Sequence, residues 1–248
     1  MSTAINGSAT LEDISPHPLA DLPEGTKNPL DYALTQRDGS TLAMVRAAVA
    51  HNQTLMAYQP VMRDADDPKI AFYEGFIRIL DPTGRVIPAR EFMPVVEKTQ
   101  LGREIDVLSL NAGLAALSEN KGLRLSINMS ARSIGYAGWT TLLNRWLSRD
   151  GTIGERLILE ISEKSAMQMP ELVASFMDQL QTRGVCFALD NFGSDYIAIR
   201  YLKEMFFDIL KIDGQFARGV SDHPDNRAIV SIMVSIARNF DMITVAEQ

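Results

Sequence analysis

The sequence predicts an α/β protein, a (β/α) barrel of the TIM type that is incomplete at its C-terminus. Short apolar strands alternate with helical segments along the chain, which is typical of parallel strands wrapped by helices. The chain has 248 residues, and a barrel of this type typically needs about 250. Seven strands are predicted where a closed barrel has eight, and the sequence ends directly after the seventh.

Residues 1–39 are expected to form a flexible N-terminal tail or linker, and residues 40–248 the barrel domain. The first segment is rich in Ser, Thr, Asp, Pro and Gly and carries only scattered apolar residues. Such a composition favours little regular structure. From Thr41 the apolar pattern becomes regular, and Leu42, Val45 and Val49 predict a short helix.

The remaining elements follow from short apolar runs, turn residues and helical spacing. Two strands, a turn and a long helical region come first: Leu55–Met62, Ile70–Leu80, Asp81–Gly84 and Ala89–Glu119. The later strands are Leu123–Met129, Leu157–Ser162, Val185–Asp190, Asp208–Ile212 and Met242–Glu247. The later helices lie around Trp139–Arg149, Pro170–Arg183, Ile197–Phe206 and Asn226–Asn239.

The net charge is −7, from 24 Lys and Arg against 31 Asp and Glu. This balance argues against binding to a nucleic acid polymer or a membrane surface, and a phosphate-bearing substrate would need metal ions to offset the repulsion. No apolar run approaches the roughly 18 residues of a membrane span, and no signal peptide is evident at the N-terminus. The cytoplasm is therefore the expected location.

Sulfur and imidazole chemistry is not indicated. The single cysteine, Cys186, stands in an apolar run and is expected to be a buried structural thiol. The three histidines, His17, His51 and His223, are not spaced as zinc ligands.

Polar residues able to bind a cation stand on or at the ends of six predicted strands. They are Glu74, Asn128, Glu160, Asp190 with Asn191, Lys211 and Glu247. The carboxyl ends of barrel strands converge on one mouth, so these side chains are expected to meet in space. Oxygen donors suit Mg²⁺, Mn²⁺ or Ca²⁺. One such acid is usually solvated or caps a helix, but six such strands in one chain are difficult to explain in that way.

Lys211 lies inside the apolar strand Ile209–Ile212. A buried lysine is costly unless carboxylates pair with it, so Lys211 is either part of a structural ion pair or a residue of the site. Its position among Glu160, Asp190 and Glu247 favours the site.

Seven short motifs together resemble those of the EAL domain family, in the family's order and with its approximate spacing. They are Tyr58-Gln59-Pro60, Glu74-Gly75-Phe76-Ile77-Arg78, Ser126-Ile127-Asn128-Met129-Ser130, Leu159-Glu160-Ile161-Ser162-Glu163, Asp190-Asn191-Phe192-Gly193, Leu210-Lys211-Ile212-Asp213 and Val245-Ala246-Glu247. The stretch Pro88–Asp106 is also similar to the family. The resemblance covers about residues 41–248.

The resemblance implies hydrolysis of cyclic di-GMP to linear pGpG at the mouth of a barrel that holds Mg²⁺ or Mn²⁺. The first metal would be held by Glu74, Asn128, Glu160 and Asp190. A second metal would depend on Asn191. Lys211 and Glu247 would orient and activate the attacking water, and Glu163 would brace the loop after the fifth strand. Gln59 would face a guanine and Arg78 a phosphate.

Five positions depart from the family pattern. Glu-Ala-Leu is Glu74-Gly75-Phe76 here, which keeps the carboxylate and alters the pocket wall. The paired Asp-Asp is Asp190-Asn191. A Gly expected near Asp195 is absent, and Gln248 stands where the family has Gly. A further Glu and a Gln of the family site would lie beyond residue 248.

Three interpretations stay open at this point. The first is a working phosphodiesterase with reduced activity. The second is a catalytically impaired cyclic di-GMP receptor that signals through a protein partner or as a homodimer. The third is an unrelated metal-dependent barrel enzyme such as a lyase or an aldolase, which the register of the motifs disfavours.

Overall fold

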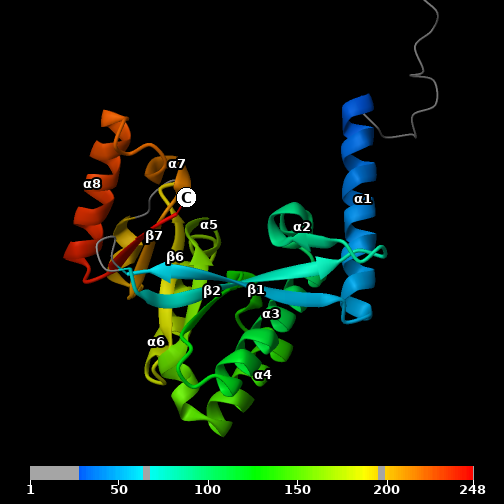
Figure 1. Cartoon of the computed structure of the whole chain (residues 1–248), viewed down its shortest axis with the longest axis horizontal. Coiled ribbons are helices and arrows are strands. Elements are labelled where there is room, and N and C mark those ends of the chain that lie inside the picture. The colour runs from blue at the N-terminus through cyan, green and yellow to red at the C-terminus, as the bar shows by residue number, and fades with distance from the viewer. Residues whose placement is uncertain (1–27, 64–67, 195–198, 248) are drawn as a thin grey trace, which may run out of the picture.

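The computed structural model describes residues 28–63, 68–194 and 199–247. One curled sheet organises the fold, and helices lie around its outer side (Figure 1). Its strands are paired in the order β1 (Thr54–Met62), β2 (Ile70–Leu80), β4 (Leu125–Asn128), β5 (Leu157–Ser162), β6 (Cys186–Phe192), β7 (Ile209–Ile212) and β8 (Ile243–Ala246). The short β3 (Val86–Pro88), which the sequence did not predict, pairs with β2.

The first strand runs in a different direction from the one expected. β1 pairs antiparallel with β2, with Gln59 opposite Glu74, whereas β2 and β4 to β8 pair in parallel. The expectation of parallel strands throughout was therefore wrong for β1. Met62 and Ile70 are too close in sequence for a helical crossover, so the two strands can form only a hairpin.

The sheet is open. β1 and β8 stand at its two ends, and within the described residues they do not pair with each other. The predicted TIM-type barrel is confirmed in this incomplete form, with seven main strands that curl but do not close.

The first helix begins earlier than predicted. α1 spans Pro29–Ala50, so residues 29–39 are helical rather than part of a tail. The side chain of Asn28 accepts a hydrogen bond from the Asp31 amide at 2.9 Å, and Pro29 occupies the first helical position. Both features start a helix even where the following residues lack an apolar pattern. Residues 1–27 of the predicted tail lie outside the described part of the chain.

The long helical region predicted over Ala89–Glu119 is two helices, α2 (Ala89–Val96) and α3 (Gln100–Glu119). The Thr99 hydroxyl caps α3 by accepting a hydrogen bond from the Leu101 amide at 3.2 Å. Gly102 lets the two helices meet, because a Cβ there would lie 2.7 Å from the Val96 carbonyl oxygen. The turn between the helices therefore depends on a cap and a close backbone approach.

Most of the other predicted helices are present as α4 (Ala137–Arg149), α6 (Pro170–Gln181) and α8 (Pro224–Asn239). The described part of the expected helix Ile197–Phe206 is a 3₁₀ helix, η3 (Ile199–Lys203). The short elements η1 (Ala131–Ser133), η2 (Gly151–Arg156), α5 (Glu163–Ala166) and α7 (Gly214–Ala217) were not predicted. No helix in the described ranges has the length and hydropathy that crossing a membrane requires.

The inner face of the sheet is built in layers. A small apolar cluster contains Phe72, Ile158, Ala188 and Ile209, one residue from each of four strands. Side chains alternate along a strand, so the residue two positions further on faces the same side. Those residues are Glu74, Glu160, Asp190 and Lys211. The apolar layer thus supports an ionic layer toward the carboxyl ends of the parallel strands.

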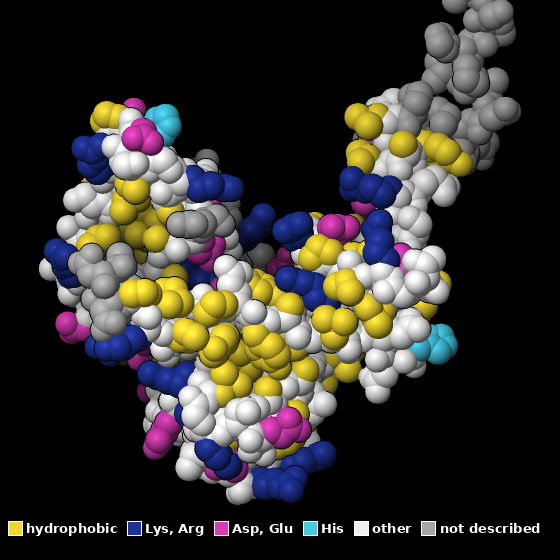
Figure 2. Space-filling view, in the orientation of Figure 1, with side chains coloured by type: hydrophobic (Ala, Val, Ile, Leu, Met, Phe, Trp, Pro, Cys, Tyr) yellow, Lys and Arg dark blue, Asp and Glu magenta, His cyan; other side chains and the backbone are white. Residues whose placement is uncertain are grey.

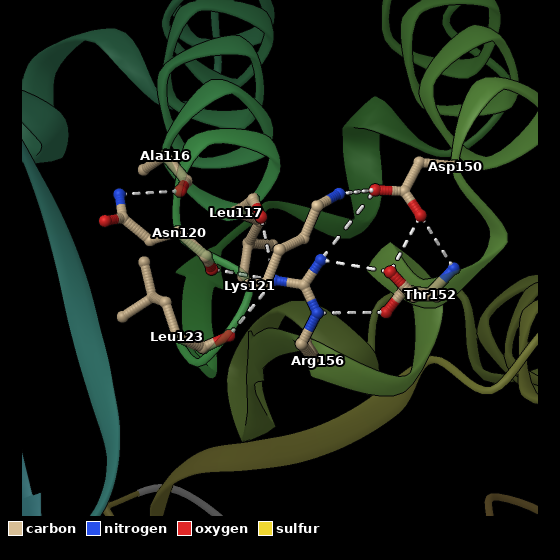
Figure 3. Close-up of polar contacts among 8 residues, drawn as sticks. All are labelled: Ala116, Leu117, Asn120, Lys121, Leu123, Asp150, Thr152 and Arg156. Atoms are coloured by element: carbon tan, nitrogen blue, oxygen red, sulfur yellow. Dashed lines mark hydrogen bonds and ion pairs between the residues drawn. The ribbon is translucent and has the colours of Figure 1, made fainter.

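At the other end of the sheet, Arg156 ties the end of α3 to the start of β4 (Figure 3). Its Nη1 donates to the carbonyl oxygens of Leu117, Asn120 and Leu123 at 2.7, 3.1 and 3.3 Å. Its Nε donates to the Thr152 carbonyl oxygen at 3.2 Å. The last carbonyl groups of a helix have no hydrogen-bond donors within the helix. The planar guanidinium of Arg156 supplies donors at the end of α3.

Replacement of Arg156 by lysine should destabilise the fold, because an ammonium cannot serve three carbonyls and Thr152 together. We expect Arg156→Lys to lower the free energy of unfolding by about 1–2 kcal/mol. Urea denaturation measures this, with the exposed Arg145→Lys as the matched control. Equal unfolding midpoints for the two variants would contradict the assignment.

A buried carboxyl group holds the segment after β4. Asp106, on α3, accepts hydrogen bonds at Oδ2 from the Ser130 amide at 3.0 Å and from the Ser133 hydroxyl at 2.5 Å. Burial raises the pKa of Asp106 to about 7, against the lowering effect of these hydrogen bonds. The pKa of the unfolded chain is near 3.8, so between these pH values the folded state retains a proton that the unfolded state has lost.

The stability contributed by Asp106 should therefore be complete below about pH 4 and be lost as the pH rises through 7. Between pH 6 and pH 8 the loss amounts to about 1.4 kcal/mol. Asp106→Asn keeps an acceptor for both donors and cannot ionise. Between pH 6 and pH 8 the unfolding free energy of this variant should therefore fall by about 1.4 kcal/mol less than that of the unmodified chain. Denaturation in EDTA at both pH values measures the difference, and parallel pH profiles for the variant and the unmodified chain would refute it.

Candidate functional site

Lys211 lies at the centre of the ionic layer. Its Nζ is 2.9 Å from Glu74 Oε1, 2.8 Å from Glu160 Oε2, 3.1 Å from Asp190 Oδ1 and 2.8 Å from Glu247 Oε1. The side chain is 1% exposed. The predicted meeting of these five residues is therefore observed, and they come from β2, β5, β6, β7 and the end of β8.

Negative charge exceeds positive charge in this cluster, with four carboxyl groups around one ammonium. Burial alone would lower the pKa of Lys211, but the surrounding carboxylates outweigh it and raise the pKa, so the lysine stays charged. Burial raises the pKa of Glu160 to about 8 and that of Glu247 to about 7, with help from neighbouring acids. Near pH 7, the protons that Glu160 and Glu247 retain therefore remove part of the surplus negative charge of the cluster.

The donor set fits a hard divalent cation in charge and atom type. Glu160 Oε1 is buried and has no hydrogen-bond partner. Asp190 Oδ1 also accepts no hydrogen bond, although Lys211 Nζ lies 3.1 Å away. Carboxylate oxygens of this kind suit Mg²⁺ or Mn²⁺. Within the described residues, however, no three His, Cys, Asp or Glu side chains are arranged as ready metal ligands. One oxygen of each of the four carboxyl groups faces Lys211 Nζ.

A cavity of about 490 Å³ opens beside the ionic layer, and Asn128, Asp190 and Asn191 form one part of its wall. Gln59, Phe76 and Arg78 from the β1–β2 hairpin line it as well, together with Arg90 on α2. Figure 2 shows the face on which the molecule is hollowed between its α7–α8 side and its α2 side, with acidic and basic side chains along the hollow. Gln59 and Arg78, the predicted ligand-binding residues, thus share one cavity with three of the predicted metal ligands.

The wall carries both substitutions of the Glu-Ala-Leu motif. A Cβ at Gly75 would lie 2.9 Å from Met56 Sδ and 3.2 Å from the Ser126 carbonyl oxygen, so the glycine accommodates Met56. The Arg78 guanidinium lies over the Phe76 ring, 5.4 Å from its centroid, and Nη1 donates to the Ile77 carbonyl oxygen at 3.1 Å. Phe76 therefore fixes the place of an arginine that faces the cavity.

Asn191 is the second-last residue of β6, close to the loop that follows the strand. Its Nδ2 donates to Asp190 Oδ2 at 2.6 Å, and its backbone has a φ of 56°, in the left-handed region that Asn tolerates. Two residues later the Gly193 amide donates to Glu163 Oε2 at 3.0 Å, which is the contact expected of a residue that braces this loop. The position near Asp195, where the family pattern has Gly, lies outside the described residues.

Three charged cavity residues were not predicted as site residues: Arg90, Glu97 and Asp106. All three belong to the stretch Pro88–Asp106, whose similarity to the family assigned no role to a single residue. Asn128 was predicted as a metal ligand, and its Nδ2 donates a hydrogen bond to Glu74 Oε1 at 3.4 Å, so it borders the ionic layer through Glu74.

A family model described as EAL domain matches residues 42–248. A relative in Shewanella oneidensis, named cyclic di-GMP phosphodiesterase PdeB, is 30% identical over 98% of this chain and 30% of its own length. The Pseudomonas aeruginosa protein named bifunctional diguanylate cyclase/cyclic di-GMP phosphodiesterase MucR is 29% identical over 82% of this chain and 30% of its own length. The chain thus spans less than a third of these curated relatives.

Solved structures agree in fold. One described as "PaMucR Phosphodiesterase, c-di-GMP complex" is 28% identical and has a TM-score of 0.70, covering 84% of this chain and 85% of that chain. The FimX EAL domain from Pseudomonas aeruginosa bound to c-di-GMP has a TM-score of 0.72 at 22% identity, covering 84% of this chain and 85% of that chain. Since the family model covers most of the sequence and the strand-end residues converge as its motifs imply, the chain belongs to the EAL domain family.

Proposed function

We propose that this chain binds cyclic di-GMP in the cavity and hydrolyses it slowly to linear pGpG. The observation that carries the proposal is the buried Lys211, held by four carboxyl groups beside a cavity that also contains Arg78 and Gln59. An acidic cluster repels a phosphodiester unless cations offset its charge, so the arrangement suits a reaction that uses a divalent metal.

Substrate binding is assigned to the cavity wall. Arg78 would grip a phosphate through its forked guanidinium, which Lys could not reproduce. Gln59 would face a guanine with its amide, which can both donate and accept hydrogen bonds. Glu163 would act indirectly, by holding the loop after β6 at the Gly193 amide.

Glu74, Asn128, Glu160 and Asp190 would hold a first Mg²⁺ or Mn²⁺, and Asn191 would contribute to a second. When bound, such ions neutralise phosphate charge and make water a better nucleophile. Glu247, whose pKa is raised to about 7, would take the proton of the attacking water. Lys211 would hold Glu247 in place and stabilise developing negative charge.

In the reaction, the water oxygen forms a bond to one phosphorus and the bond from that phosphorus to the 3′ oxygen breaks. The water proton passes to Glu247, and the released 3′ oxygen gains a proton to become a hydroxyl. The ring opens at one of its two phosphodiesters, which gives pGpG with a 5′ phosphate and a 3′ hydroxyl.

A receptor without turnover is the second candidate. Asn191 supplies a neutral amide where the family has a second carboxylate, and its hydrogen bond to Asp190 occupies an oxygen of the adjacent ligand. Such a receptor would act through a signalling protein partner or as a homodimer. Appearance of pGpG from cyclic di-GMP in the presence of Mn²⁺, followed by chromatography, separates the two. If the chain binds cyclic di-GMP and forms no product, the receptor is the candidate that remains. If the chain shows neither binding nor product, both candidates are refuted.

Loss of Arg78 should weaken ligand binding. We expect Arg78→Ala to raise the Kd for cyclic di-GMP at least tenfold, since a charge-assisted hydrogen bond contributes about 1.5–3 kcal/mol. Calorimetric titration in EDTA, which keeps the ligand intact, measures the change. An unchanged Kd would mean that the ligand lies elsewhere.

Restoring the second carboxylate should increase turnover. Asn191→Asp places two carboxyl groups side by side, and like charges at that distance repel unless a cation lies between them. In EDTA the variant should melt below the unmodified chain, Mn²⁺ should raise its melting temperature by more, and its pGpG production at saturating Mn²⁺ should be at least tenfold faster. Unchanged melting shifts and an unchanged rate would show that the missing carboxylate does not limit this protein.

A further inference from the structure

A second arginine faces the cavity from the helix side. Arg90, the second residue of α2, lines the cavity together with Arg78 of β2. Arg90 also borders a separate hollow of about 690 Å³, whose wall includes Arg37 and Arg85. It therefore stands between the candidate ligand cavity and a surface hollow beside α1.

Among the described residues, Arg90 has no acidic partner. In the described part of the chain, no carboxylate lies within ion-pair distance of its guanidinium, whereas Arg37 and Arg85 pair with Asp38 and Asp81. Burial lowers the pKa of Arg78, and the charge of Arg90 lowers it further, so the two cations repel each other. Two unpaired cations that face one cavity favour an anion between them.

The acids of the same cavity do not offset this pair. Asp106 is buried, its pKa is raised to about 7, and it is hydrogen-bonded to the segment after β4. The negative charge of Glu97 raises the pKa of Asp106 further. Asp190 belongs to the Lys211 cluster. The cavity thus has an acidic end at Lys211 and a cationic wall at Arg78 and Arg90.

We propose that Arg90 is a second phosphate-binding residue, which acts with Arg78 on the phosphodiester that is not cleaved. This inference rests on the proposed function and deepens it. A cyclic dinucleotide carries two phosphates on opposite sides of its ring. One would lie at the carboxylate–lysine end, where the reaction takes place, and the other would lie against the two arginines.

The position of Arg90 suits a residue that binds without reacting. Its side chain is exposed, so it can adjust to the ligand, and solvent screens it more than Arg78. Its contribution should therefore be smaller than that of Arg78. Because both guanidinium groups would contact one phosphate, their effects should not be additive.

The test compares two charge-removing substitutions that keep a long polar side chain. Arg90→Gln should raise the Kd for cyclic di-GMP about three- to tenfold in EDTA at low salt, and this difference should shrink as NaCl is added. Arg85→Gln changes the net charge equally but lies on the second hollow and not on the cavity, so its Kd should stay within twofold of the unmodified chain. In the double variant Arg78→Ala/Arg90→Gln, the loss should differ from the product of the single losses.

The outcomes separate this inference from the proposed function. If the unmodified chain does not bind cyclic di-GMP, the proposed function fails first. If it binds and Arg90→Gln matches Arg85→Gln at every salt concentration, the function stands and the role of Arg90 is refuted. Equal weakening by both substitutions would also refute it, because net charge alone would then explain the change. Circular dichroism melts of each variant identify any loss of folding.

Discussion

The buried contact between Lys211 and four carboxyl groups is the constraint on which the rest of the structure depends. Removing such charges from water is costly, and only close pairing compensates for it. The partners come from β2, β5, β6 and the end of β8, so several strands must keep their register together. A slip of one residue in any of them would turn its acid to the other face of the sheet. The apolar layer of Phe72, Ile158, Ala188 and Ile209 below it fixes the same register by packing.

The sequence was sufficient to predict this cluster because two simple rules act on it. Parallel strands end at one mouth, and polar residues in otherwise apolar strands have few other places to go. Glu74, Glu160, Asp190, Lys211 and Glu247 therefore met as expected, although the ammonium at their centre occupies oxygens that had been predicted to face a metal. The part of the fold that follows from apolar periodicity, β2 and β4 to β8 with α4, α6 and α8, was predicted for the same reason.

The errors have local causes that periodicity does not contain. The direction of β1 follows from the short connection to β2, and the start of α1 follows from the Asn28 cap and Pro29. The break between α2 and α3 depends on Thr99 and on the close approach that Gly102 permits. Arg90 could not be distinguished from any exposed helix residue, because its significance lies in sharing a cavity with Arg78. That relation exists only once the hairpin and α2 are placed in space.

The departures from the family pattern divide by position in a way that bears on mechanism. Phe76 supports Arg78 at the cavity, Gly75 accommodates Met56, and the contacts of Lys211 are intact beside both. Asn191 contacts a predicted metal ligand directly, through its hydrogen bond to Asp190. The ionic layer joins four strands of the sheet through Lys211, whereas Asn191 contacts this layer only through Asp190. On the proposed function, ligand binding would depend on groups that are present, and the speed of hydrolysis would depend on the carboxylate charge that Asn191 does not supply.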